Sequence, residues 1–433
     1  MCSKSSVGMR GLFAIFFAIS LLKATSAAAQ QEGVLHSFNN NNRDGTMPEA
    51  ALVVDALGNL YGATYYGGDG TCTDNGSAVG CGTAFKLTPT GSGQWTKQTL
   101  HNFHDNGWDG YNPLGGLVMD AAGNLYGTTL SGGAGSCTDG NGVVIGCGAV
   151  FELTPTASGP WTIKILYSFQ NNGIDGAGPY AGVIFDQTGN LYGTSIGGGS
   201  NEYGTVFELS PKAIGAWNEK ILFNFDPAFG EEPAGGLVFD TVGNLYGTAL
   251  YGGSYSNGVA FELSPQGDGS WVEAVLHSFG GTGDGIVPWN TLVLDSAGNL
   301  YGTTNLGGAF GFEGGTAFEL TPAGSGDWTE TILYSFGGSS TDGAGPAGGL
   351  TFDSTGNLYG ATRAGGTTGF GTAYQLIPSS NGTWTENQLH SFGSAKDGSV
   401  PGAGLVIGSN GQLYGTTERG GYYGFGTVFE IVP

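Results

Sequence analysis

Short hydrophobic runs separated by Gly, Pro, Asn and Asp recur along the chain from about residue 32 to its end. They are rich in Val, Leu, Thr, Tyr and Phe, which favour β-strands, and beyond residue 30 no stretch keeps a helical period. Four such runs follow one another in a constant order, and in one unit they are residues 181–186, 190–194, 204–211 and 217–225. Four strands per unit, repeated in tandem, are typical of a β-propeller.

The phrase Gly-Asn-Leu-Tyr-Gly marks each unit, with Gln replacing Asn in the last copy. The copies are residues 58–62, 123–127, 189–193, 243–247, 298–302, 356–360 and 411–415. A fixed period of this length indicates stacked supersecondary units. In six units an Asp ends the first run, and Asp-x-x-Gly-Asn predicts a tight turn in which Asp bonds the backbone and Gly takes a positive φ. The seven units therefore predict seven blades.

The two ends of the repeat region complement each other. The last unit stops after its third run, at residues 429–433, and residues 32–38 resemble an isolated fourth run. We expect the N-terminal strand to join the last blade, because closing the ring removes two exposed sheet edges. The predicted fold class is therefore all-β: one seven-bladed β-propeller over residues 30–433, with four strands per blade.

The first 29 residues have the pattern of a secretory signal. Lys4 and Arg10 precede a short apolar run at residues 11–22, and Ala27, Ala28 and Ala29 fit a small-residue cleavage site. The apolar run is too short to span a membrane comfortably. We therefore expect a protein secreted to the extracellular medium or the periplasm, with no membrane insertion.

The predicted mature chain keeps two local pairs of cysteines, Cys72 with Cys81 and Cys137 with Cys147. An even count in an exported protein favours disulfides. Both pairs fall between the second and third strands of their units, where a surface loop can grow. A metal site is the alternative, but no His or Cys-x-x-Cys spacing accompanies these residues.

The charge is strongly acidic, with a formal value of −23 for the whole chain. Removal of Lys4, Arg10 and Lys23 with the leader leaves 9 basic and 35 acidic residues, a net charge of −26. This excludes a basic face for nucleic acid and disfavours anionic membrane surfaces. It is compatible with simple solubility, with cation binding, and with neutral or cationic ligands.

The units resemble the GloVer tandem repeat of bacterial secreted proteins, the "choice-of-anchor" family. The matching residues are Gly-Asn-Leu-Tyr-Gly-Thr-Thr, the Gly-Gly that follows, and Gly-Thr-Val-Phe-Glu-Leu-Thr-Pro. The resemblance covers nearly all of residues 33–433 and implies no established activity. Because the chain ends inside its last repeat, without a sorting tail, we expect a freely secreted protein.

Candidate ligand-binding residues fall in the loops that connect strand four to strand one. In a propeller with strand one innermost, these loops share a face with those between strands two and three, which is the usual ligand side. Six of them contain Asp-Gly, at Asp44, Asp109, Asp175, Asp284, Asp342 and Asp397. These carboxylates are candidates to bind Ca²⁺ or sugar hydroxyls near a central channel. The alternative is that each Asp only forms its turn. Otherwise we expect no cofactor.

Residues that break the repeat are the other candidates. Six of the eight Trp hold one repeat position and are expected to pack, whereas Trp108 and Trp289 do not. Either can stack on a sugar ring or pack within its loop. Arg363 and Arg419 can bind a carboxylate or serve as surface charges. His36, His101, His277 and His390 share a position with Tyr and Phe, so we expect a structural role for their rings.

Two function classes remain open. One is a non-catalytic binding or scaffold module, a monomer whose partner is an extracellular glycan or a cell-surface protein. The other is a carbohydrate-active lyase or hydrolase with an acid/base pair in the top loops. No nucleophile elbow, zinc-protease motif or phosphate-binding loop is present. Because the top loops mostly repeat, the sequence favours binding.

Overall fold

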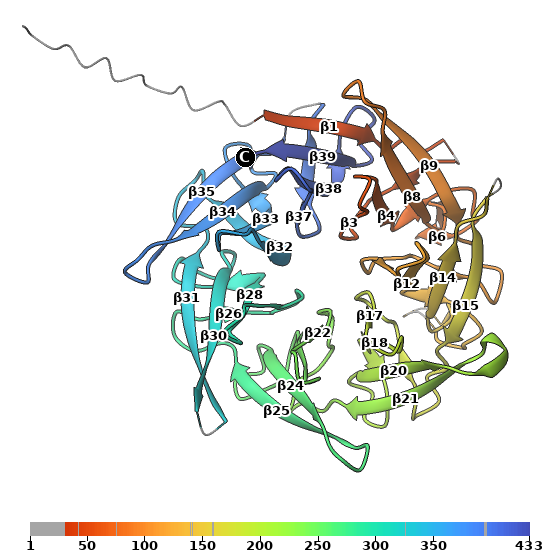
Figure 1. Cartoon of the computed structure of the whole chain (residues 1–433), viewed down its shortest axis with the longest axis horizontal. Helices are drawn as coiled ribbons and strands as arrows, with labels where there is room; N and C mark the ends of the chain where they lie inside the picture. Colours follow the sequence, from red (N-terminus) through yellow and green to blue (C-terminus); the bar gives the residue numbers. More distant parts are fainter. Residues whose placement is uncertain are drawn as a thin grey trace, which may run out of the picture.

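The computed structural model describes residues 31–433, except residues 42, 75, 139, 141, 158, 159, 325, 394 and 395. Seven small antiparallel sheets are arranged around a central channel, as blades of a β-propeller (Figure 1). The predicted fold class is confirmed, and within each blade the first strand is innermost and the fourth outermost. The predicted signal peptide lies outside the described residues and remains a prediction.

The blades follow the chain in order. Blade 1 contains β3 (Val53–Val54), β4 (Leu60–Thr64), β8 (Thr83–Pro89) and β9 (Trp95–Asn102). Blade 2 contains β11 (Val118–Met119), β12 (Leu125–Thr129), β14 (Ala149–Thr154) and β15 (Thr162–Ser168). Blade 3 contains β17 (Ile184–Phe185), β18 (Leu191–Ser195), β20 (Thr205–Pro211) and β21 (Trp217–Asn224). Blade 4 contains β22 (Val238–Phe239), β23 (Leu245–Ala249), β24 (Val259–Pro265) and β25 (Trp271–Ser278).

The remaining blades complete the ring. Blade 5 contains β27 (Val293–Leu294), β28 (Leu300–Thr304), β30 (Thr316–Gly324) and β31 (Asp327–Ser335). Blade 6 contains β32 (Gly343–Phe352), β33 (Leu358–Gly365), β34 (Thr372–Pro378) and β35 (Trp384–Ser391). Blade 7 contains β36 (Gly398–Pro401), β37 (Val406–Ile407), β38 (Leu413–Gly420), β39 (Thr427–Val432) and β1 (Gln31–Ser37).

The structure also contains short two-stranded ladders and a 3₁₀ turn outside the blade sheets. The ladders pair β2 (Gly45–Thr46) with β5 (Tyr66–Gly67), β6 (Thr73–Asp74) with β7 (Ser77–Ala78), β10 (Gly110–Tyr111) with β13 (Ser131–Gly132), β16 (Gly176–Ala177) with β19 (Gly197–Gly198), and β26 (Gly285–Ile286) with β29 (Leu306–Gly307). The 3₁₀ turn η1 is Ala213–Gly215.

The hydrogen bonds of blade 1 explain why the phrase Gly-Asn-Leu-Tyr-Gly repeats. The Asp55 carboxylate accepts bonds from the backbone and side-chain nitrogens of Asn59, at 2.9 and 2.7 Å, and from the Tyr61 hydroxyl at 3.0 Å. Gly58 has φ +78°, which closes the turn at low steric cost. Leu60 is fully buried. The predicted Asp-x-x-Gly-Asn turn is therefore present, and Tyr61 extends it into the sheet.

The last glycine of the phrase is required by packing. A Cβ atom at Gly62 would lie 2.7 Å from the Phe85 ring and 2.9 Å from Leu52, closer than real contacts allow. The seventh unit loses both turn partners together, because Gly408 replaces the Asp and Gln412 replaces the Asn. The two positions therefore behave as one hydrogen-bonded pair.

The hydrophobic core is divided among the interfaces between neighbouring blades. One buried cluster joins Tyr61 of blade 1 to Leu125 and Phe151 of blade 2. The Trp161 ring, just before the outer strand of blade 2, lies 6.2 Å from the Tyr61 ring. The same Tyr–Trp contact recurs between later blades, as Tyr192–Trp271, Tyr246–Trp328, Tyr301–Trp384 and Tyr414–Trp95. This confirms a packing role for these Trp residues.

The N-terminal strand closes the ring as expected. β1 pairs antiparallel with β39, from Gln31 opposite Val432 to Ser37 opposite Thr427 (Figure 1). Phe38 follows β1 directly, is fully buried, and lies 5.2 Å from the Phe85 ring of blade 1. One terminal segment therefore completes blade 7 and also fills its interface with blade 1.

Both predicted disulfides are present. Cys72 bonds Cys81 and Cys137 bonds Cys147, each with Cα atoms 5.0 Å apart. They close short loops within blades 1 and 2, between the second and third strands. The metal alternative is therefore wrong for these four residues.

A chain that begins at residue 38 instead of residue 31 is expected to melt at a lower temperature and to self-associate. Loss of β1 exposes the edge of β39 and unpairs its backbone. Thermal unfolding and size-exclusion chromatography of the two purified chains would measure this. Equal melting temperatures with two monomeric elution profiles would show that β1 does not close the ring.

Candidate functional site

A cavity of about 400 Å³ opens where the inner strands meet at the central channel. Much of its wall comes from the residues that directly follow the proline before each first strand. In chain order these are Glu49, Leu114, Tyr180, Ala234, Trp289, Ala347 and Gly402. All but Ala347 line the cavity. One repeat position therefore presents mostly unlike side chains to a shared space.

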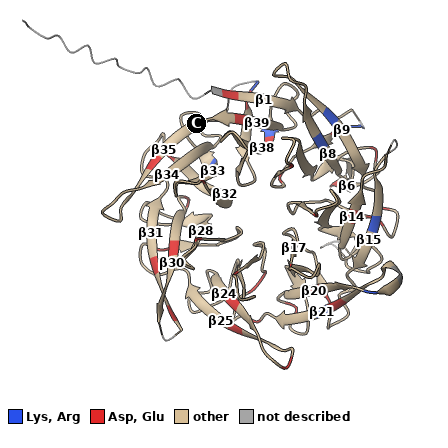
Figure 2. Ribbon diagram, in the orientation of Figure 1, with Lys and Arg blue, Asp and Glu red and all other residues tan. Residues whose placement is uncertain are grey.

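A second repeat position adds the charged part of the site. This position directly follows the five residues of the second strand that begin with Leu-Tyr-Gly in every unit. In chain order, the residues at this position are Tyr65, Leu130, Ile196, Leu250, Asn305, Arg363 and Glu418. Arg363 lies on β33 and Glu418 on β38, and Figure 2 shows charged segments on both strands near the channel. The repeating frame thus places a cation and an anion beside each other only at blades 6 and 7.

Three blades converge on the Arg363 guanidinium. It forms an ion pair with Glu418, whose side chain is 4% exposed, while the Arg363 side chain is 28% exposed. The guanidinium carbon lies 5.8 Å from the centre of the Trp289 ring, a cation–π distance. The Tyr180 ring lies 6.3 Å from the Trp289 ring at a tilted angle. The result is an aromatic wall held next to a buried ion pair.

Burial makes the acidic groups of this cavity resist ionisation. Burial, reinforced by the nearby Glu418 charge, raises the pKa of Glu49 to about 7, although Arg363 and Arg419 oppose the shift. Burial likewise raises the pKa of Glu418, against the same two arginines. Glu49 is therefore partly protonated near neutral pH. It can donate a hydrogen bond in one form and accept one in the other.

The structure brings together two of the residues that the sequence singled out. Trp289 and Arg363 contact each other and both line the cavity. Arg419 is exposed, and its charge acts on Glu49 and Glu418. Trp108 does not line the cavity; it is 69% exposed in the loop between β9 and β10. Arg363 is already paired with Glu418, so a ligand carboxylate would have to compete for it.

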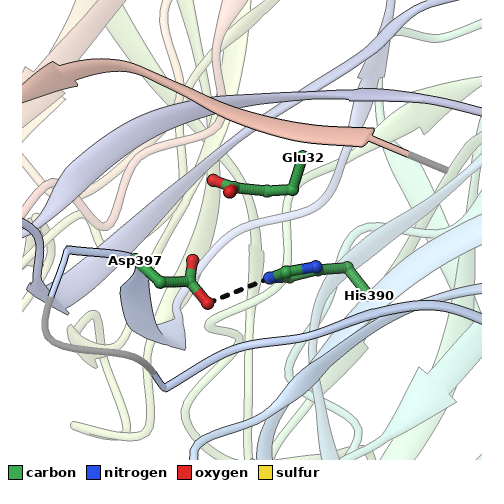
Figure 3. A group of neighbouring side chains, drawn as sticks. All are labelled: Glu32, His390 and Asp397. Carbon is green, nitrogen blue, oxygen red and sulfur yellow. Dashed lines mark hydrogen bonds and ion pairs between the residues drawn. The ribbon is translucent and has the colours of Figure 1, made fainter. Parts of the chain in front are cut away.

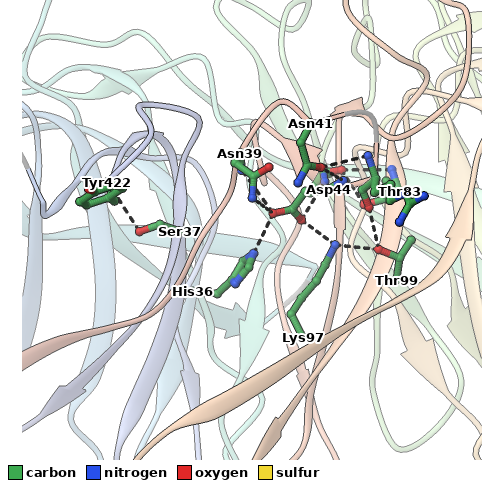
Figure 4. Close-up of polar contacts among 12 residues, drawn as sticks. His36, Ser37, Asn39, Asn41, Asp44, Thr83, Lys97, Thr99 and Tyr422 are labelled. Atoms are coloured by element: carbon green, nitrogen blue, oxygen red, sulfur yellow. Dashed lines mark hydrogen bonds and ion pairs between the residues drawn. The ribbon is translucent and has the colours of Figure 1, made fainter.

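The six Asp-Gly carboxylates lie at the joints between blades and do not line the cavity. Each accepts a hydrogen bond from the aromatic ring that precedes it on the outer strand. The pairs are His36–Asp44, His101–Asp109, Tyr167–Asp175, His277–Asp284, Tyr334–Asp342 and His390–Asp397. Figure 4 shows the first of them, in which Asp44 also binds Asn39 and Lys97. These contacts favour the structural alternative for both the Asp and the His residues.

The unit without Asp-Gly supports this interpretation. Its outer strand carries Phe223, which has no hydrogen-bond donor, and Phe229 occupies the Asp position before Gly230. The two rings lie 6.1 Å apart at 88°. The loop thus exchanges a hydrogen bond for an edge-to-face aromatic pair. The Asp is present where the ring can donate and absent where it cannot.

Glu49, Tyr180 and Glu418 were missed by sequence reasoning. They lie in two repeat positions where the residue type changes from unit to unit while the flanking Pro and Gly-Gly stay constant. This variation between units was a signal in the sequence that marked both positions as candidates. It was overlooked because candidates were chosen by residue type, as a Trp outside the common position or a rare Arg, and not by comparing one repeat position across the units.

The sequence matches the Gloeobacter/Verrucomicrobia repeat over residues 70–293 and 218–429. The chain belongs to this repeat family. The resemblance read from the Gly-Asn-Leu-Tyr-Gly units is thereby confirmed. No curated protein matches the chain.

Three similar solved structures are distant in sequence. The extracellular domain of a candidate one-component system from B. thetaiotaomicron is 13% identical with a TM-score of 0.51, covering 93% of this chain and 42% of that one. A protein of unknown function from Dyadobacter fermentans is 11% identical with a TM-score of 0.44, covering 83% and 98%. A candidate oxidoreductase (glucose dehydrogenase) from Thermus thermophilus is 15% identical with a TM-score of 0.42, covering 93% and 100%. At 13% identity, the likeness to the first of these supports the fold alone.

Within the described part of the chain, no helix has the length and apolar character needed to cross a bilayer. The charge pattern in Figure 2 shows acidic residues scattered around the outer strands, with few basic ones. The charged residues that line the cavity are one base and one acid, Arg363 and Glu49, so an excess of acid does not distinguish it.

Half-buried acidic residues also lie at the joints between blades, and one of them, Glu219, predicts that stability depends on pH. Burial, reinforced by the charge of Asp175, raises the pKa of Glu219 on β21 to about 7 from an ordinary 4.5. The folded protein therefore retains this proton when the unfolded chain has lost it. Stability contributed by Glu219 is then full below about pH 4.5 and declines as the pH rises towards 7.

Glu219→Gln is expected to reduce the fall in melting temperature between pH 5 and pH 8, because the amide cannot ionise. Thermal scans across this range would measure the slope. The exposed Glu202→Gln, whose side chain stands at a loop surface, serves as the control. An unchanged slope in Glu219→Gln would contradict the assignment.

Proposed function

We propose that this protein is a secreted, non-catalytic binding propeller whose channel cavity recognises a neutral or cationic extracellular glycan. The observation that carries the proposal is the concentration of unlike side chains at one place on a repeating frame. Four unlike residues from four different blades line one cavity: Glu49, Tyr180, Trp289 and Arg363. Glu418, from a fifth blade, forms an ion pair with Arg363. A purely structural channel would not need this asymmetry.

The side chains present suit a sugar. A half-exposed Trp ring offers a flat apolar surface to the C–H face of a pyranose, and Tyr180 extends that surface. Glu49 can exchange hydrogen bonds with hydroxyls in either protonation state, while Glu418 holds Arg363 in place. The partly neutralised acid favours neutral or cationic sugars. A cell-surface protein that inserts a side chain into the cavity is the competing partner.

The disulfides, the closed ring and the acidic composition support the proposed compartment, oligomeric state and type of partner. Two disulfides are stable in an oxidising compartment, which supports the extracellular medium or the periplasm. A closed ring, in which β1 covers the edge of β39, supports a monomer. The acidic composition argues against nucleic acid as a ligand.

Trp289→Ala is expected to weaken retention on the bound polysaccharide by about tenfold, equivalent to about 1.4 kcal/mol. The melting temperature should change little, because Trp289 lies at the cavity and outside the buried hydrophobic clusters between neighbouring blades. Affinity electrophoresis against a polysaccharide panel would measure retention. Trp108→Ala removes an exposed Trp outside the cavity and is the matched control. Equal losses in both variants would place the site elsewhere.

A carbohydrate-active enzyme is the second candidate, and Glu49 favours it. A carboxyl whose pKa is raised to about 7 beside a second carboxyl, Glu418, is a suitable general acid. If this is the activity, Glu49→Gln should abolish oligosaccharide release while retention persists. Release should also decline as the pH rises above about 7. A wild-type protein that retains polysaccharide without releasing any reducing ends would exclude this candidate.

A further inference from the structure

The blade joints carry a second kind of chemistry, away from the channel. At five joints, the Asp-Gly loop faces one charged side chain on the outer strand of the next blade. In joints 2/3, 4/5, 5/6 and 6/7 this side chain is Glu219, Glu330, Glu386 or Glu32, each under the electrostatic influence of its joint Asp. In joints 4/5 and 6/7 the loop's ring partner is a His. Only these two groups, within the described residues, combine three donor atoms within 4.8 Å of one another.

The joint between blades 4 and 5 has the tighter measured geometry. His277 Nε2 lies 3.1 Å from Asp284 Oδ2 and 3.5 Å from Glu330 Oε2. The ligands of a tetrahedral zinc ion, with bonds of about 2.0–2.1 Å, are about 3.3 Å apart. The two distances from His277 therefore match the spacing of a zinc ligand set, and all three donor atoms lie within 4.8 Å of one another.

The joint between blades 6 and 7 repeats the arrangement with the N-terminal strand. Figure 3 shows the Glu32 carboxylate of β1 directed toward Asp397 and the His390 ring. His390 Nε2 lies 3.0 Å from Asp397 Oδ2. The three residues come from β1, from β35 and from the loop that follows β35, so they connect two blades.

Buried oxygens at both joints lack a hydrogen-bond partner. They are Asp284 Oδ1 and Glu330 Oε1 in the first, and Glu32 Oε1 in the second. The Asp284 side chain is only 8% exposed. A buried carboxylate oxygen without a partner is costly, because it loses its hydration and gains nothing in return. Each joint thus has unused anionic ligand capacity beside a His nitrogen.

The joint between blades 7 and 1 contains a positive charge at the corresponding position. There Lys97 of β9 replaces the Glu, and its Nζ lies 2.6 Å from Asp44 Oδ1 (Figure 4). His36 Nε2 contacts the same carboxylate at 3.0 Å. This joint therefore holds a positive charge between the His–Asp pair and the next blade. Where Glu stands in place of Lys97, a bound cation can supply that charge.

We propose that joints 4/5 and 6/7 each bind one divalent zinc ion, through His277, Asp284 and Glu330 in one and Glu32, His390 and Asp397 in the other. One imidazole nitrogen and two carboxylate oxygens form a donor set that zinc accepts, with water at the fourth position. His277 and His390 are 22% and 23% exposed, which leaves a route from solvent. The second ion fastens β1 to blade 6 and so secures the ring closure.

Zinc uptake by the full chain tests the proposal. After treatment with a chelator and dialysis, the protein is titrated with ZnCl₂ and bound metal is counted by elemental analysis. Two ions per chain are expected, with a melting temperature a few degrees higher at saturating zinc. Co²⁺ used as a spectroscopic probe should show visible absorption bands typical of tetrahedral coordination.

Two exchange variants make the test specific. Glu330→Lys copies the Lys97 joint, so it supplies the cation internally and should lower the count to one while keeping the fold. Lys97→Glu creates the third donor beside His36 and Asp44 and should raise the count to three. His36→Ala, at a joint with no vacancy for metal, should leave the count at two.

Three results would overturn the proposal. One is no zinc uptake by a folded wild-type chain. Another is a count that is unchanged by both exchange variants. The third is a melting temperature that rises at acidic pH, does not change with zinc, and loses this pH dependence in Glu330→Gln and Glu32→Gln. That result would show that a shared proton occupies these joints.

Discussion

Contact between neighbouring blades is the interaction on which the whole structure depends. Each sheet has only four or five short strands, too few to bury a hydrophobic face alone. The Tyr of the repeated phrase in one blade therefore packs against the Trp of the next, as Tyr61 does against Trp161. Such an arrangement has unsatisfied faces at both ends unless it closes. The pairing of β1 with β39 is accordingly a condition of stability for all seven blades.

Small residues near the axis allow the blades to converge. A Cβ atom at Gly115 or Gly182 would collide with the backbone of the neighbouring blade. The same requirement leaves few positions around the channel where a large side chain fits. The residue after the proline is one of them, and it holds Glu49, Tyr180 and Trp289. Structural and functional roles are thus separated by position within each unit: most positions repeat because they pack, and a few vary because they face the cavity.

The blade joints form a polar layer outside the hydrophobic core. Each Asp-Gly carboxylate is held by a ring nitrogen or hydroxyl, and the exchange of Asp for Phe229 beside Phe223 shows that the partners change together. At five joints, the outer strand of the next blade places a half-buried Glu or Lys opposite this carboxylate. Joints with the same backbone arrangement therefore differ in charge. The joint with Lys97 contains its own positive charge, whereas a joint with Glu at this position favours an added cation.

The sequence by itself determined the frame. Period, strand order, blade number, closure and both disulfides were predictable because each rests on local signals: strand-forming runs, turn residues, and an unpaired run at each end. The site was predictable only in part. Trp289 and Arg363 were among the candidates and both line the cavity, but they come from blades 5 and 6, and nothing in their spacing shows that their side chains touch.

Only the tertiary structure decided where the carboxylates point. The Asp-Gly residues were expected near the channel, yet their side chains turn into the joints because a ring on the preceding strand donates to them. Glu49 and Glu418, far apart in the chain, share a charge environment because ring closure brings blade 7 next to blade 1. Contacts between blades depend on the three-dimensional path of the whole ring, whereas a repeat in the sequence reports only what is the same in every blade.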